Sequence, residues 1–185
     1  MEPGPRVMPG TYLVRLEAGD AVIEGEVSVR LDPRTSMSRA VITARHAAMM
    51  ESYRLSGAVE EANEALASVS SQLTAIDEML EESADESAAL EDEVAAVRTA
   101  VESIREDLGD AAGGAGVWGR IQGVSGPASA DALWAIDASW TNLPGVINRL
   151  NTLLSGDVGG LYRRAYQDAT RPAVPDSVGM PSRGG

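Results

Sequence analysis

The sequence of 185 residues contains no cysteine, no lysine and no phenylalanine. Without cysteine there can be no disulfide bond, no thiolate metal ligand and no cysteine nucleophile. His46 is the only histidine, so the chain also lacks the second imidazole or thiolate of a usual zinc site. We therefore expect His46 at the surface or at the edge of a helix seam, and we predict no metal centre.

Basic residues are also scarce, because 15 arginines face 28 acidic residues and give a formal net charge of −13 at pH 7. A negative surface repels phosphate backbones and anionic lipids, so we expect neither nucleic acid nor a membrane as a partner. No apolar run approaches the roughly 18 residues that a membrane span needs. Residues 1–10 lack the basic and apolar regions of a signal peptide.

Strand patterns are confined to residues 1–34, which we expect to form a β-strand pair. One strand is predicted at 11–16 and a second at about 22–31, joined through the turn sequence EAGD, and Gly25 is typical of a bulge. The apolar side chains expected on one face of the pair are Tyr12, Val14, Leu16, Val27, Val29 and Leu31. An isolated hairpin is marginally stable in water at best, so this face needs a cover.

Two different structures could cover this apolar face. The helices that follow could fold back over the strands. Alternatively, the strands could be the last two of an immunoglobulin- or fibronectin-like sandwich whose other strands lie outside this chain. We favour the sandwich, because a Pro-Gly-x-Tyr-x-Val turn into a strand, followed by a closing strand, is typical of the end of such a domain.

The rest of the chain is patterned mainly as helix. One helix is predicted from an N-cap at Ser36 or Ser38 to about Glu82, and a second ends where Gly109 would serve as the C′ residue. The seam of the first helix comprises Leu55, Val59, Ala62, Leu66, Val69, Leu73, Ile76 and Leu80. The seam of the second comprises Leu90, Val94, Val97, Val101, Ile104 and Leu108. Steps of four and three keep one stripe facing a partner and indicate an antiparallel helical hairpin.

A glycine-rich segment at 109–127 interrupts the helical pattern. We expect it to form a long loop without regular structure, anchored by Val117, Trp118 and Ile121.

A third helix is predicted to start at a cap formed by Ser129 and to kink at Pro144. Its seam comprises Leu133, Ile136, Trp140, Leu143, Ile147, Leu150 and Leu154. Gly156-Asp157 is expected to separate a short fourth helix at about 158–169, and residues 171–185 are expected to be a disordered tail.

These elements predict a mainly α fold class, with an antiparallel bundle of three helices plus a short fourth over residues 35–170. The bundle follows the strand pair at 1–34. The first helix would be roughly 65 Å long at 1.5 Å per residue, and the second covers only part of that length. We expect the third helix to cover the remainder.

The order of these segments resembles a known family. The stretches "PGTYLVRL … GEVSVRLDPR", "EANEAL" and "LLSGDVGGLYRRAYQDATRP" are together similar to the C-terminal region of bacterial proteins with BNR-type repeats. These sortilin-like β-propeller proteins are commonly labelled glycosyl hydrolases or exo-sialidase-like. The likeness covers most of residues 7–175. It implies a propeller, then a sandwich-like segment, then a helical bundle, in a protein exported to the periplasm or beyond by a signal outside this chain.

The resemblance does not supply catalytic residues. The Ser-x-Asp-x-Gly-x-x-Trp turns of propeller blades are absent here, so no glycan-binding or glycan-cleaving residue carries over. The resemblance therefore implies an accessory region and not an enzyme.

The residues themselves also offer no clear catalytic motif. Glu60-Glu61 and Glu81-Glu82 are expected on exposed helix sides, and the nine acids from Asp77 to Glu93 lack the spacing of a calcium loop. No serine lies in a Gly-x-Ser-x-Gly elbow, and "GDAAGGAGVWG" lacks the Gly-Lys-Ser/Thr of a phosphate loop. We predict no catalytic, metal-binding or cofactor-binding residues.

The candidate interaction residues are aromatic or apolar. Trp118, in the glycine-rich loop, is the one aromatic candidate for an exposed binding residue, whereas Trp140 lies on a seam and belongs to the core. The other candidates, on the strand face, are Tyr12, Val14, Val27 and Val29.

Our main hypothesis is a non-catalytic structural and interaction module of a larger BNR-type propeller protein, with the propeller of its own parent chain as partner. The alternative is a self-contained helical-bundle protein that homodimerises through exposed seam surface. A third hypothesis is a glycosidase fragment whose chemistry lies elsewhere in the parent chain.

Overall fold

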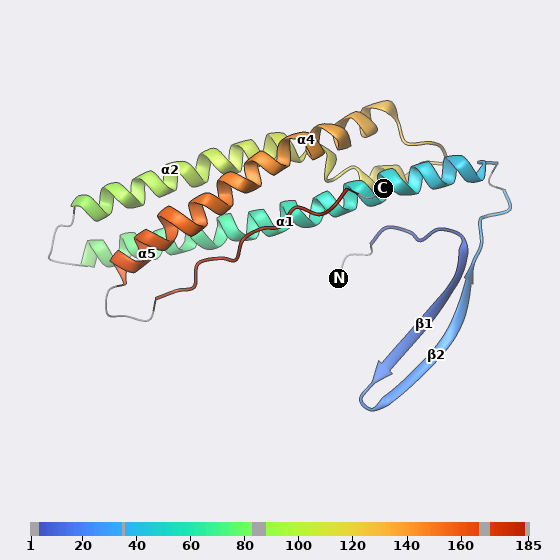
Figure 1. Ribbon diagram of the computed structural model, residues 1–185, viewed down its shortest axis with the longest axis horizontal. Helices are drawn as coiled ribbons and strands as arrows, with labels where there is room; N and C mark the ends of the chain where they lie inside the picture. The colour runs from blue at the N-terminus through green and yellow to red at the C-terminus, as the bar shows by residue number, and fades with distance from the viewer. Residues whose placement is uncertain (1–3, 35, 83–87, 167–170, 184–185) are drawn as a thin grey trace.

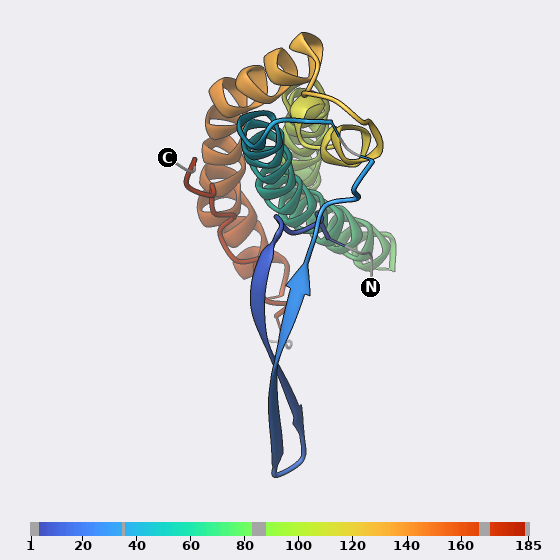
Figure 2. The same ribbon diagram turned by 90° about the vertical axis from the view of Figure 1, so that its right-hand side faces the viewer.

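The computed structural model describes residues 4–34, 36–82, 88–166 and 171–183. It confirms the mainly α fold class, because three long helices form a bundle that follows a two-stranded antiparallel sheet (Figure 1). The hydrophobic core lies among the helices, and the sheet projects away from them (Figure 2).

The sheet is a β-hairpin of β1 (Gly10–Ala18) and β2 (Ala21–Val29). Ala18 pairs with Ala21 across a two-residue turn, and Gly19 has a φ of +60°. A positive φ at the first central position alone suits a type II′ turn, which matches the twist of the strands and favours glycine there. The register is unbroken from Gly10–Val29 to Ala18–Ala21, so the bulge expected at Gly25 is wrong: Gly25 pairs regularly with Val14.

Two helices form the antiparallel pair that the seams predict. Helix α1 (Arg39–Glu82) begins at the cap Ser38, whose Oγ accepts from the Val41 amide at 3.4 Å. Helix α2 (Ala88–Ala111) runs back along it. The fully buried seam residues of the pair are Leu55, Ala62, Leu66, Val69, Leu73, Ile76, Val94, Val97, Val101, Ile104 and Leu108. The burial of these positions follows the predicted seams closely.

The glycine-rich segment is more regular than its composition suggests. Helix α2 continues past Gly109 to Ala111, so Gly109 is not a C′ residue, and a 3₁₀ turn, η1 (Ala112–Gly114), follows directly. A short helix, α3 (Trp118–Gly123), occupies part of the predicted loop. The expectation of a loop without regular structure is therefore wrong.

Two buried serines account for this order. Ser52 of α1 donates its hydroxyl to the Gly114 carbonyl at 2.6 Å and accepts from the Trp118 amide at 3.0 Å. Ser139, on the third long helix, donates to the Ala111 carbonyl at 2.6 Å and accepts from the Gly114 amide at 2.8 Å. Buried backbone groups must find partners, and these hydroxyls supply them where the regular ladder ends.

Gly114 also lies against the backbone of that third helix. A Cβ added there would come within 2.6 Å of the Ile136 Cα and would also clash with the Ala135 carbonyl oxygen. Only glycine allows this close approach of two backbones.

The third long helix, α4 (Ala130–Leu153), begins at Ser129, whose Oγ accepts from the Ala132 amide at 3.2 Å, as the capping sequence predicts. It continues through Pro144. Most of its predicted seam is buried or packed against the core, but Leu133 is exposed.

No break occurs at Gly156-Asp157, contrary to the sequence prediction. Helix α4 passes into a π-helical turn, η2 (Leu154–Val158), and then into α5 (Gly159–Ala165). The buried residues Leu150, Leu154 and Val158 are four apart, and each such step carries an α-helix about 40° beyond one turn. A π turn contains more residues than an α turn, so it reduces this extra rotation and keeps the apolar side chains facing the core.

The segment at 171–183 is extended and packs on the bundle, so the prediction of a disordered tail is wrong over these residues. It runs along the groove between α1 and α4 (Figure 1). Val178 is buried, and Val174 and Met180 contact the core. Side-chain partners on the helices thus order a segment whose composition suggests disorder.

Both ends of the described chain reach the same level of α1. Gly4 lies beside the Tyr53 ring, and the Arg183 guanidinium pairs with Glu51 at 3.2 Å. Residues two apart on a helix point about 200° apart, so the two ends lie on opposite sides of α1 (Figure 2).

Candidate interaction surface

The hairpin register gathers six apolar side chains on one face, which we call the hairpin face. Tyr12 pairs with Val27 and Leu16 with Ile23, and cross-strand partners point to the same side of a sheet. The residues of the hairpin face are Tyr12, Val14, Leu16, Ile23, Val27 and Val29. Four of them, Tyr12, Val14, Val27 and Val29, are residues that the strand pattern predicts for an interaction surface.

The middle of the hairpin face is open to solvent. Side-chain exposure is 49% for Val14, 60% for Leu16, 65% for Ile23 and 49% for Val27. Tyr12 and Val29, near the base, are half-buried, and the Tyr12 hydroxyl donates to the Met8 carbonyl at 2.5 Å. The two strands pack chiefly on each other, so the bundle does not cover this face.

The opposite side of the hairpin has a different chemistry. Leu13 and Val22 share it with Thr11, Ser28 and four charged side chains, namely Arg15, Glu17, Glu24 and Glu26. An apolar side chain amid charges is common on a solvated face, whereas a contiguous apolar row commonly marks an interaction surface. The asymmetry between the two sides identifies the hairpin face as the candidate.

A hollow of about 600 Å³ lies at the base of the hairpin, between the N-terminal segment, the start of α1 and the end of α3. Arg45 closes one wall, because its guanidinium donates to the carbonyls of Ile121 at 3.0 Å and Gln122 at 2.8 Å. His46, expected at the surface or a seam edge, is half-buried and lines this hollow. These bonds connect α1 to α3 directly beneath the hairpin.

The link from β2 to α1 contains a local ion pair. The Arg34 guanidinium binds the Asp32 carboxylate, and this hydrogen bond lowers the pKa of Asp32 and raises that of Arg34. Both groups are fully exposed, so the pair shapes the link without contributing much stability.

Trp118, the aromatic candidate from the sequence, is not an open binding residue in the structure. Its ring is half-buried and packs edge-on against Tyr53, with ring centroids 5.5 Å apart. The exposed tryptophan is Trp134 on α4, at 73% exposure, whereas Trp140 packs against the core as expected. Trp134 lies off the α4 seam, and that helical position was the signal that could have identified it.

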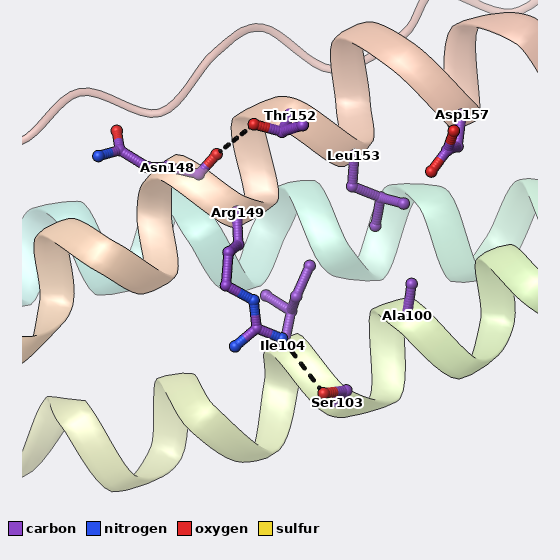
Figure 3. Close-up of a pocket in the computed structure, with 8 residues that line it drawn as sticks. All are labelled: Ala100, Ser103, Ile104, Asn148, Arg149, Thr152, Leu153 and Asp157. Atoms are coloured by element: carbon purple, nitrogen blue, oxygen red, sulfur yellow. Dashed lines mark hydrogen bonds between the residues drawn. The ribbon is translucent and has the colours of Figure 1, made fainter.

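A shallow groove of about 380 Å³ lies between α2 and α4 (Figure 3). Arg149 reaches across it, donating to the Ser103 hydroxyl at 3.2 Å and pairing with Asp107. Asp157, from the π turn, lines the same groove. The groove is therefore crossed by an ion pair between α2 and α4.

Some acidic residues in the stretch from Asp77 to Glu93, where α1 ends and α2 begins, form ion pairs between helices. Asp77 pairs with Arg98 and Glu93 with Arg164, while residues 83–87 lie outside the described part of the chain. Among the residues that the structure describes, no three His, Asp or Glu side chains gather as a metal site requires. In the same part of the chain, no helix has the length and apolarity to cross a membrane.

No protein-family model, curated protein or solved structure matches this chain.

Proposed function

We propose that this chain is a non-catalytic structural and interaction module of a larger BNR-type β-propeller protein, and that it docks through the hairpin face. The observation that supports this proposal is the exposed apolar row at the centre of that face. Fully burying a large aliphatic side chain yields about 1.5–3 kcal/mol. Covering the exposed half of Val14, Leu16 and Ile23 would thus contribute on the order of 3 kcal/mol.

The cover that fits best is the apolar face of another sheet. Two packed sheets place their inner faces about 10 Å apart and interdigitate the side chains of alternate residues, which are the positions exposed here. The strand pair would then complete a sandwich-like segment of the parent protein. The helical bundle is linked to the segment before the hairpin by the Arg6 amide, which donates to Gln122 Oε1 at 2.7 Å, and it would brace that sandwich-like segment.

Homodimerisation through the helix seams is less well supported. Leu55, Leu66 and Leu143 are fully buried inside one copy of the bundle, so these seam positions are not available to a second copy. The hairpin face is a better candidate than the seams for such a contact, because its middle is exposed.

The coding sequence upstream of Met1 provides the first test. Propeller blades with Ser-x-Asp-x-Gly-x-x-Trp turns in the same reading frame are expected. A stop codon and a ribosome-binding site directly before Met1 would contradict the proposal.

The encoded upstream region then serves as the binding partner in a titration calorimetry experiment. Leu16→Arg, on the hairpin face, is expected to weaken binding at least tenfold, because it buries a charge in an apolar contact. Leu13→Arg is the matched control, since Leu13 is 68% exposed on the other side of the same strand. Equal loss with both variants, or dimerisation of the unmodified chain with no binding to the upstream region, would refute the proposal.

A further inference from the structure

The groove between α1 and α4 holds residues 171–183, which we call the tail segment. At its centre, the Asn151 side chain donates from Nδ2 to the Val178 carbonyl and accepts at Oδ1 from the Val178 amide, both at 2.9 Å. One amide side chain thus satisfies both backbone groups of one residue, as a neighbouring β-strand would. Such a contact recognises an extended backbone whatever its side chain.

Side chains of the tail segment supply the selectivity. Val178 is buried, and Val174 and Met180 contact the core on either side of it. The α1 wall near Val178 includes Ala65 and Ser68, whose small side chains leave room for a chain to lie against the helix. Prolines at 172, 175 and 181 favour an extended backbone, which lowers the entropy lost on binding.

Arg183 forms the second anchor of the tail segment. Its guanidinium pairs with Glu51 of α1 at 3.2 Å and with Asp137 of α4, and it lies 5.9 Å from the centre of the Trp140 ring. An aromatic ring beside two carboxylates attracts a cation through both its quadrupole and the opposite charges. The groove therefore has a backbone clamp, an apolar pocket and a cation site in sequence.

We propose that this groove is a binding site for an extended peptide, occupied here by the tail segment of the same chain and able to accept the tail segment of a second copy. The recognised pattern is a valine at the Asn151 clamp and an arginine five residues later. This inference is independent of the hairpin face and of the proposed propeller partner.

The tail segment has the advantage of being covalently attached. A tethered segment acts at an effective concentration in the millimolar range, so it outcompetes a free peptide of the same sequence. Cutting the tether removes that advantage without removing any contact. The intact chain should accordingly bind little added peptide, and the cut chain should bind it readily.

The experiment uses the full chain with a protease recognition sequence inserted after residue 168. After cleavage, a fluorescent peptide with the sequence of residues 171–185 is added, and exchange is followed by fluorescence anisotropy. We expect saturable binding to the cut chain and at least tenfold weaker binding to the uncut chain. A peptide carrying Val178→Asp should not bind, and one carrying Arg183→Ala should bind two- to fivefold more weakly.

The matched control lies one turn earlier on α4. Asn151→Ala is expected to weaken binding of the peptide about tenfold, because two hydrogen bonds are lost, whereas Asn148→Ala alters an exposed asparagine on the same helix and should have no effect. Circular dichroism of the cut chain should show unchanged helix content. Loss of helicity on cleavage, a tail that never exchanges, or equal effects of the two asparagine variants would overturn the proposal.

Discussion

At Gly114 the chain passes directly against the backbone of α4, and this contact yields the sharpest prediction for a single residue. Gly114→Ala forces a Cβ into the Ile136 Cα at 2.6 Å, so two backbones must separate. We expect the free energy of unfolding to fall by about 3 kcal/mol, as in severe overpacking. Gly113→Ala is the control, since an added Cβ there meets no atom within 4 Å. Urea denaturation of both variants measures the difference, and equal stabilities would contradict the expected clash.

Tyr162 places a hydroxyl in the core, and no described protein group forms a hydrogen bond with it. An unsatisfied buried polar group costs about 1–3 kcal/mol. Tyr162→Phe removes the hydroxyl and keeps the ring, which packs edge-on against Tyr166. We therefore expect the variant to be more stable than the unmodified chain by about 1 kcal/mol in urea denaturation. A loss of stability would show that the hydroxyl is satisfied.

Tyr162 also predicts that the stability of the fold depends on pH in the alkaline range. Burial, with a smaller effect from Tyr166, raises the pKa of Tyr162 to about 12 from an ordinary value of 10. Between these values the unfolded state loses a proton that the folded state keeps, so stability falls as pH rises from 10 to 12. Each factor of ten in proton affinity corresponds to about 1.4 kcal/mol, so the loss approaches 3 kcal/mol. Between pH 9 and pH 11.5, denaturation should show about 2 kcal/mol of this loss in the unmodified chain and a smaller loss in Tyr162→Phe.

Among the elements, the hairpin and α1 should differ most in local stability. The backbone hydrogen bonds of β1 and β2 join only two strands with exposed side chains, whereas much of α1 is buried against α2 and α4. Protection from hydrogen exchange follows burial and packing. We expect hairpin amides to exchange within seconds to minutes and the amides around Leu66 to remain protected for much longer. Exchange mass spectrometry measures both, and equal protection would mean that the hairpin is covered in solution.

Some elements of the fold can be predicted from local sequence patterns, and others cannot. The spacing of apolar residues along the chain predicts the helix seams, and a serine with its close neighbours predicts the caps at Ser38 and Ser129. The structure confirms the seams and the caps. The glycine-rich segment is different, because its order depends on Ser52, more than sixty positions away, and on Ser139. A serine within a helical pattern ordinarily indicates a solvent-exposed position, so no local signal identified these partners.

The residues of the candidate surfaces also differ in how far the sequence predicts their positions. Alternation in the strands correctly placed Tyr12, Val14, Val27 and Val29 on one face, but Ile23 joined them only through the register of the pairing. Trp118 was a candidate for exposure because it lies in a glycine-rich segment, but its ring packs edge-on against Tyr53 of α1. The tail segment was expected to be disordered because proline and glycine dominate it, and Asn151 could not be recognised as its partner without the fold.

For the whole molecule, net charge governs self-association. At pH 7 we expect the charge of −13 to oppose association of copies through the exposed hairpin face, and the pI of about 4.4 marks where this repulsion vanishes. Dynamic light scattering should therefore show a larger, concentration-dependent radius at pH 4.4 than at pH 7. Leu16→Arg is expected to reduce this association and Leu13→Arg to leave it in place. Association that is insensitive to both variants would assign it to another surface.

The positions of Gly4 and Arg183 have a consequence for how the gene could be rearranged. Both lie at one level of α1 but on opposite sides of the helix, so a linker that joins them has to be long enough to pass around α1. A circularly permuted chain, opened between Gly19 and Asp20, would then begin and finish at the far tip of the hairpin while keeping the helices in their order. Insertion of the bundle into a loop of a host protein would likewise need two connections that reach opposite sides of α1.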